Sequence, residues 1–106
     1  MNAGKIASQA SHAALGSFLH SSADTQREYH KDFPASPGTK VCLNCPTLEH
    51  LLQAEEQAKQ AGIPYYKVID SGCKNFFNGN PIVTALGLGP ATKSQIQHIT
   101  SKFKLL

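Results

Sequence analysis

Residues 4–21 constrain the fold of this sequence most strongly, because a helical pattern coincides there with very small side chains. The segment contains no proline, and the apolar residues Ile6, Ala10 and Ala13 recur at helical spacing. More than half of its residues are alanine, serine or glycine. A helix with so little side-chain bulk can lie close against a sheet or another backbone.

Three short β-rich segments occur in the rest of the chain, at residues 40–45, 65–70 and 82–86. Proline or glycine bounds each of them, which is typical of strands separated by turns. Between the first two strands, residues 47–61 have the pattern of a helix that begins after an N-cap threonine and ends before a glycine.

Two further segments complete the predicted order. Residues 22–39 are mostly polar and are expected to form a loop, with a short helical turn near residues 26–31. The last helix begins after Thr92, which forms a capping box with Gln95. The order helix, loop, strand, helix, strand, strand, helix predicts an α/β fold with one βαβ crossover.

The size and composition of the chain fit one domain. It has 106 residues and a formal net charge of +3, which permits a polyanionic partner without requiring one. No apolar run approaches the roughly 18 residues of a membrane span, and no secretory signal is expected at the N-terminus. Three cysteines, an odd number, argue against a disulfide framework and favour a reducing cytosol.

The first helix carries a polar stripe that is a candidate site. Lys5, Gln9 and His12 are spaced i, i+4, i+7, so their side chains share one narrow face, with Gly16 one turn further on. A cation, an amide and an imidazole together can bind an oxyanion or phosphate and move a proton. The alternative interpretation is an ordinary solvated face opposite the packing face.

Asp70 and Thr84 are candidates on the strands. Asp70 stands at the carboxyl end of its strand, where open α/β sheets place ligand sites, and could orient a histidine or pair with Lys5. An Asx-type turn that closes the strand is the alternative. Thr84 lies within the third strand, and a strand threonine taken alone is usually structural.

The cysteines suggest a zinc or redox site less strongly. Cys42 and Cys45 are three residues apart, which in a strand places them on opposite faces, and Cys73 has no nearby histidine. We expect Cys42 and Cys45 to be ordinary buried or half-buried residues. A zinc or redox module stays a remote alternative.

Three motifs, taken together, resemble those of the type 2 peptidyl-tRNA hydrolases. They are the Gly-Lys-Ile-Ala-Ser-Gln-Ala-Ser-His-Ala helix at residues 4–13, Ile-Asp-Ser-Gly at 69–72 and Thr-Ala-Leu-Gly-Leu-Gly-Pro at 84–90. Their order and approximate separations match, as does the closing segment at residues 103–106. The resemblance implies a three-layer α/β/α fold with a small mixed sheet.

The resemblance also implies a function. Members of this family are usually homodimeric, cytosolic enzymes that hydrolyse the ester between a peptide and the 3′-terminal ribose of tRNA, and so rescue tRNA from stalled translation. The resemblance implies no membrane association and no metal or organic cofactor. The implied catalytic residues are Lys5, His12, Asp70 and Thr84, and the implied substrate-binding residues are Gln9, Lys74, Gly87 and Gly89.

The sequence departs from the family pattern in two informative places. Met1 corresponds to a methionine that follows the family's first strand, so residues 1–106 are expected to form a single domain that lacks this strand and its aspartate. Lys74 replaces a threonine and could add a phosphate-binding cation. These departures leave an alternative, in which a catalytically weak family member binds tRNA or a protein partner without turnover.

Overall fold

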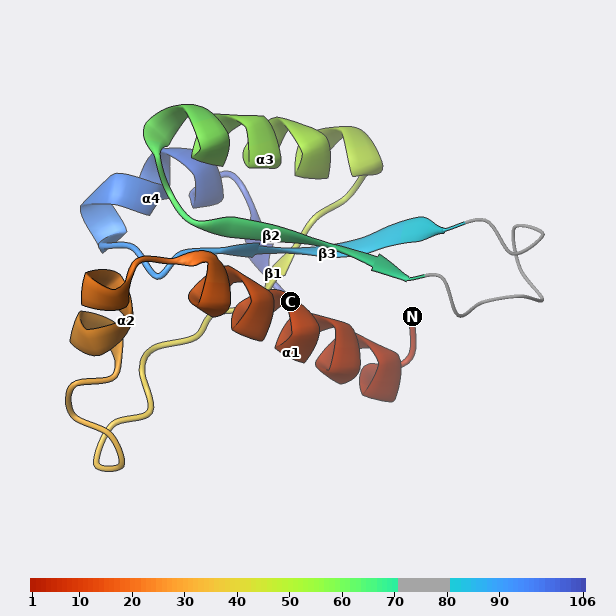
Figure 1. The fold of residues 1–106 in the computed structure, drawn as a ribbon. Helices are drawn as coiled ribbons and strands as arrows, with labels where there is room; N and C mark the ends of the chain where they lie inside the picture. Colours follow the sequence, from red (N-terminus) through yellow and green to blue (C-terminus); the bar gives the residue numbers. More distant parts are fainter. Residues whose placement is uncertain (71–80) are drawn as a thin grey trace.

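The computed structural model describes residues 1–70 and 81–106 of the chain (Figure 1). The described elements occur in the order α1 (Ala3–His20), α2 (Ala23–Tyr29), β1 (Leu43–Asn44), α3 (Leu48–Ala61), β2 (Tyr65–Asp70), β3 (Ile82–Leu88), α4 (Lys93–Thr100) and β4 (Lys104–Leu105). The predicted helices, and the strands over residues 65–70 and 82–86, are confirmed, although the second of these strands continues to Leu88.

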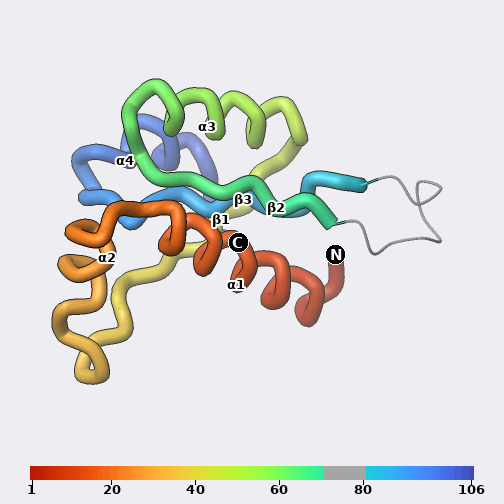
Figure 2. Tube along the Cα trace, viewed as in Figure 1, coloured from red at the N-terminus to blue at the C-terminus, as the bar shows by residue number. Residues whose placement is uncertain are grey.

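The elements form three layers around the β2–β3 pair. Helix α1 covers one face of this pair, and α3 and α4 lie on the other (Figures 1 and 2). This arrangement confirms the predicted α/β class and its α/β/α layering.

The pairing of the strands differs from the single mixed sheet that we expected. In the described ranges, β2 pairs with β3 and β1 pairs with β4, both antiparallel, in two separate two-stranded sheets. The expected βαβ crossover is therefore wrong, because β1 and β2 share no sheet. Strand propensity identifies extended backbone but not its partner, and neither β4 nor the two-residue length of β1 was predicted.

Local sequence signals fix the ends of the helices. The Thr47 side chain accepts a hydrogen bond from the backbone of His50, and Gly62 ends α3 with a left-handed φ of 71°. Thr92 and Gln95 form the predicted capping box at the start of α4. These caps satisfy backbone groups that would otherwise lack a hydrogen-bond partner. Because only certain residue types can do this, the helix ends can be predicted from the sequence.

The hydrophobic core lies between the sheet and the α3–α4 layer. Its buried members are Ala54, Ala58, Ile63 and Ile99, and the partly buried hydrophobic residues packed against them are Tyr65, Leu86, Leu88, Ala91, Ile96 and Phe103. These residues hold β2 and β3 in place on the side of α3 and α4, so the opposite face of the pair is available to α1.

Helix α1 approaches the sheet as closely as its small residues predict. A Cβ atom at Gly87 would lie 2.1 Å from the backbone oxygen of Ala13, so only glycine fits at this point of β3. The hydroxyl of buried Ser17 donates hydrogen bonds to the backbone oxygens of Pro64 and Gly89, the former at 3.3 Å. These contacts fix α1 on the sheet and so position its polar stripe.

Among residues 1–70 and 81–106, no helix combines the length and the apolar composition that a membrane crossing requires.

Candidate active site

Lys5 and Asp70 form an ion pair between the start of α1 and the end of β2. The Lys5 ammonium contacts the Asp70 carboxylate across 65 positions of sequence. Their side chains are 35% and 14% exposed, so the carboxylate is largely withdrawn from water while the ammonium still reaches solvent. A lysine held in this way presents a positioned positive charge at the surface. The ion pair suggested as one role of Asp70 is present.

Gln9 and Thr84 form a second contact between α1 and the sheet. The Thr84 hydroxyl donates a hydrogen bond to Oε1 of Gln9, which is buried. Gln9 lies one helical turn after Lys5, so the hydrogen bond and the ion pair are neighbours along the same helix face. The hydroxyl oxygen of Thr84 keeps lone pairs that can accept a further hydrogen bond.

A β-bulge explains why Thr84 faces α1. Leu86 packs against the α3–α4 core, and strict alternation along β3 would turn Thr84 toward that same core. The register instead shifts by one residue, which leaves Thr84 as the extra residue of β3. The pairs on either side are Val68 with Ala85 and Ile69 with Val83. Such bulges re-aim a side chain, here toward Gln9.

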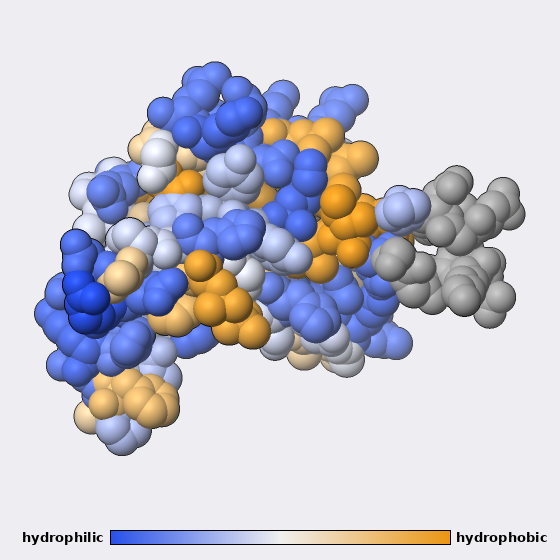
Figure 3. All heavy atoms as spheres, viewed as in Figure 1, coloured by the Kyte–Doolittle hydropathy of each residue, from blue (hydrophilic) through white to orange (hydrophobic). Residues whose placement is uncertain are grey.

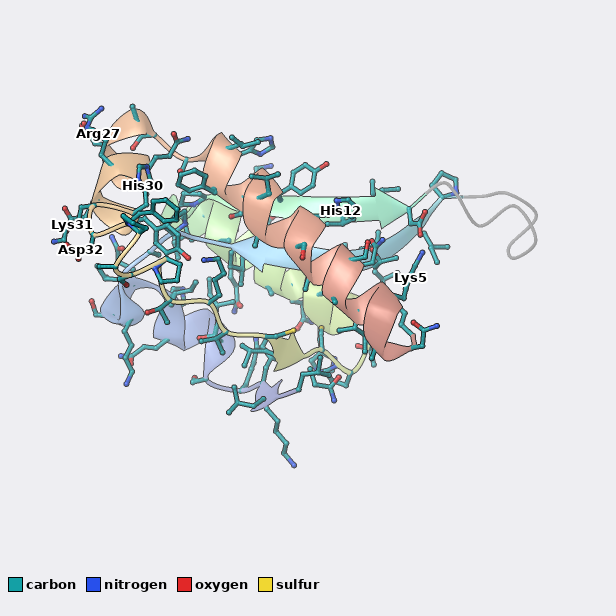
Figure 4. All side chains as sticks on the ribbon, turned by 90° about the horizontal axis from the view of Figure 1, so that it is seen from below. Lys5, His12, Arg27, His30, Lys31 and Asp32 are labelled. Atoms are coloured by element: carbon teal, nitrogen blue, oxygen red, sulfur yellow. The ribbon has the colours of Figure 1, made fainter. Side chains whose placement is uncertain are left out.

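His12 lies on the same side of α1 as Lys5, facing the end of β2 (Figure 4). It is exposed, and it lines an open groove between α1 and β2 together with Tyr66 and Val68. The stripe predicted on α1 therefore splits into parts. Gln9 is buried against the sheet, Lys5 is half-buried in an ion pair, and only His12 is fully at the surface.

The predicted substrate-binding glycines are buried. Gly87 lies directly beneath Ala13 of α1. Gly89 has a φ of 99°, donates its N–H to the backbone oxygen of Pro64 at 2.8 Å and accepts from the Ser17 hydroxyl. Both glycines serve the docking of α1, and their role in substrate binding stays a prediction. Lys74 lies outside the described residues.

The expectation that Cys42 and Cys45 are buried or half-buried is wrong for both residues. Cys42 and Cys45 are both exposed, because β1 is short and residues 40–42 lie outside any strand. Cys73 is outside the described residues. Within residues 1–70 and 81–106, no three His, Cys, Asp or Glu side chains gather as a metal site would require.

Sequence reasoning missed Ser17, which is buried and ties α1 to two loop carbonyls. Its only signal was membership of the small-residue set that predicted close helix packing. The bulge at Thr84 was also missed, because no glycine or proline lies near it in β3 before Gly87.

The arrangement is suited to stabilising negative charge and holding a water molecule. A half-buried ammonium, a carboxylate and a hydroxyl lie at one end of the α1–sheet contact, with an imidazole at the surface beside them. Groups of this kind can polarise a carbonyl, orient a nucleophilic water and transfer a proton.

Comparison with known proteins identifies a family model and relatives that match the whole length of the chain. The family model described as Peptidyl-tRNA hydrolase PTH2 matches residues 1–106. A peptidyl-tRNA hydrolase of Methanothermobacter thermautotrophicus is 37% identical over 106 residues, which are 100% of this chain and 89% of that protein. One of Methanopyrus kandleri is 35% identical, covering 100% of this chain and 88% of that protein.

A third relative has a lower identity. A probable peptidyl-tRNA hydrolase 2 of Dictyostelium discoideum is 30% identical over 105 residues, which are 99% of this chain and 49% of that protein. The match of the family model to every residue, together with identities of 30–37%, decides the classification. The chain belongs to the PTH2 family of peptidyl-tRNA hydrolases.

Proposed function

We propose that this chain hydrolyses peptidyl-tRNA with Lys5, Asp70, Thr84 and His12 as its catalytic residues. Water adds to the carbonyl carbon of the ester between the peptide and the 3′-terminal ribose. The ester bond then breaks, the ribose oxygen takes up a proton, and free peptide and tRNA leave. The enzyme class follows from the family, and the residue roles are our proposal.

Lys5 stabilises the negative charge that develops on the carbonyl oxygen, or a nearby phosphate of the tRNA end. Asp70 positions the Lys5 ammonium or the attacking water. The ion pair supports these roles because it fixes a cation that is still partly exposed to solvent.

Thr84 accepts or donates a hydrogen bond to the attacking water or to the ester. Gln9 holds the Thr84 hydroxyl, and the bulge in β3 supports this role by turning Thr84 toward α1. His12 assists proton transfer or places the substrate, and its exposed position on the same side of α1 supports this assignment. For Lys74, Gly87 and Gly89, a contact with the substrate remains a proposal from the family motif.

The single observation that carries the proposal is the ion pair between Lys5 and Asp70. It joins residues 65 positions apart at the edge of an open groove, on the helix that also holds Gln9 and His12. A surface ion pair that served stability alone would contribute little, typically about 0–1 kcal/mol.

The test is a turnover assay on peptidyl-tRNA with the substrate in large excess over the chain. The proposal expects many molecules of peptide released per chain, with intact tRNA as the second product. Binding of the tRNA without release of peptide would contradict it. That outcome would favour the catalytically weak binding module, which the family and its named relatives do not favour.

Assembly and location are also proposed, on the family resemblance. We propose a homodimer in the cytoplasm that acts on peptidyl-tRNA from stalled translation. Sedimentation equilibrium should give twice the 11.4 kDa mass of one chain. A single-chain mass at assay concentrations would contradict the dimer, and fractionation of cells would test the location.

A further inference from the structure

An open groove of about 460 Å³ runs between α1 and β2 beside the candidate active site. Its α1 wall includes His12, Leu15 and Leu19, and its β2 wall includes Tyr66 and Val68. Its volume falls within the roughly 300–1,000 Å³ that small-molecule sites occupy.

The α1 wall of the groove exposes two large apolar side chains. Leu15 and Leu19 are 59% and 61% exposed and lie one helical turn apart, so they form one continuous apolar wall. Figure 3 shows hydrophobic atoms gathered over α1 and over the end of β2 on this face. An apolar area beside a polar catalytic site is typical of a substrate-binding surface.

The groove runs from the candidate active site at one end to the rings of His20 and Tyr66 at the other. Ile69 lines it and directly precedes Asp70, and His12 belongs to both. At the far end, the His20 ring packs edge-on against Tyr66 at 5.2 Å between centroids. From His12 to His20 the helix rises about 12 Å, which matches three to four residues of extended peptide.

The lining argues for a peptide rather than for the tRNA backbone as the occupant. Among residues 1–70 and 81–106, none of those that line this groove is a lysine or an arginine. Phosphate recognition relies on such cations, whereas peptide side chains bind in apolar grooves. A substrate with its ester at Lys5 and Asp70 would therefore direct its peptide along this groove and its tRNA away from it.

We infer that this groove binds the peptide part of the substrate and favours apolar side chains in the residues before the ester-linked one. The inference rests on the proposed function. Leu15 and Leu19 are its specificity-determining residues, because they are the exposed apolar side chains of the α1 wall.

The test compares two peptidyl-tRNAs that share one tRNA and one ester-linked amino acid, with either two leucines or two glycines before it. The intact chain should show a KM about tenfold lower for the leucine substrate, and the Leu15→Ser/Leu19→Ser variant should lose this difference. Leu48→Ser is the matched control, because Leu48 is 53% exposed but lies in α3 on the opposite layer. It should keep the preference.

A second measurement separates this inference from the proposed function. Non-hydrolysable 3′-amide analogues of the two peptidyl-adenosines are titrated calorimetrically, so that binding is read without catalysis. A tighter leucine analogue that loosens in the Leu15→Ser/Leu19→Ser variant supports the groove even if no ester is hydrolysed. Hydrolysis with equal KM and equal analogue affinity for both peptides would overturn the groove and leave the proposed function standing.

A rival occupant is a second copy of the chain. If Leu15→Ser/Leu19→Ser converts a dimer to a monomer in sedimentation and leaves the peptide preference unchanged, the apolar wall is a self-association surface and the inference is wrong. Equal weakening of both peptide analogues would likewise overturn it, because it would indicate contact with the shared adenosine.

Discussion

The hydroxyl of Thr84 reaches Oε1 of Gln9 because β3 contains one more residue than its partner strand at that point. Without the bulge, Thr84 would face the α3–α4 core. The contact therefore depends on a local interruption of the regular strand pairing. Such bulges are common beside active sites.

Replacing Thr84 by valine should reduce kcat on peptidyl-tRNA by about tenfold to a hundredfold, because the change removes the hydroxyl and keeps the β-branched shape. Steady-state hydrolysis measures the effect. Thr84→Ser retains the hydroxyl and should recover most of the rate. Thr100→Val is the matched control, since the Thr100 hydroxyl also donates a hydrogen bond but lies in α4. Equal rates for Thr84→Val and Thr100→Val would remove Thr84 from the site.

Replacing Gly87 by alanine should destabilise the fold by about 2 kcal/mol or more, because the new methyl group would collide with the Ala13 backbone. Denaturant titration gives the free energy of unfolding. Gly4→Ala in the first turn of α1 is the control, since its Cβ would meet only the Asn2 side chain at 3.6 Å. Alanine there should be neutral or stabilising. Equal stability of the two variants would show that α1 does not press on Gly87.

Cys42 and Cys45 should both react quickly with iodoacetamide in the folded chain, because both are exposed. Mass spectrometry after brief labelling identifies the modified positions. The Cys42→Ser/Cys45→Ser variant should change the free energy of unfolding by no more than about 0.5 kcal/mol and should leave hydrolysis unchanged. Loss of activity in this variant would revive the redox or zinc alternative.

The parts of the fold that could be predicted from the sequence were mostly those indicated by a few neighbouring residues. The caps at Thr47 and Thr92, the left-handed glycine at Gly62 and the small residues of α1 each have a physical cause confined to a few neighbours. The pairing of β1 with β4 depends on residues about 60 positions apart and on a C-terminal strand with no β-branched residue. Such pairings arise from packing of the whole chain, which propensity does not describe.

The candidate site shows the same contrast between local patterns, which the sequence reveals, and long-range packing, which it does not. Helical spacing placed Lys5, Gln9 and His12 on one face, and strand-end position selected Asp70. The family resemblance placed Thr84 in the site, but strand alternation would have directed it away from Gln9, and only the structure shows the bulge that brings the two together. The exposed cysteines likewise follow from how short β1 is, which their own residue types do not indicate.

Peptidyl-tRNA hydrolysis by three single-residue variants tests the proposed roles of Lys5 and Asp70. Lys5→Ala and Asp70→Ala should each lower kcat/KM by about a hundredfold or more, the effect of losing a positioned charge. Lys67→Ala is the matched control, because Lys67 also extends from β2 into a half-buried ion pair, at 3.2 Å from Glu55 of α3. Of the three variants, only Lys67→Ala should keep near-normal turnover. Near-normal turnover in Lys5→Ala and Asp70→Ala would contradict the proposed roles of these two residues.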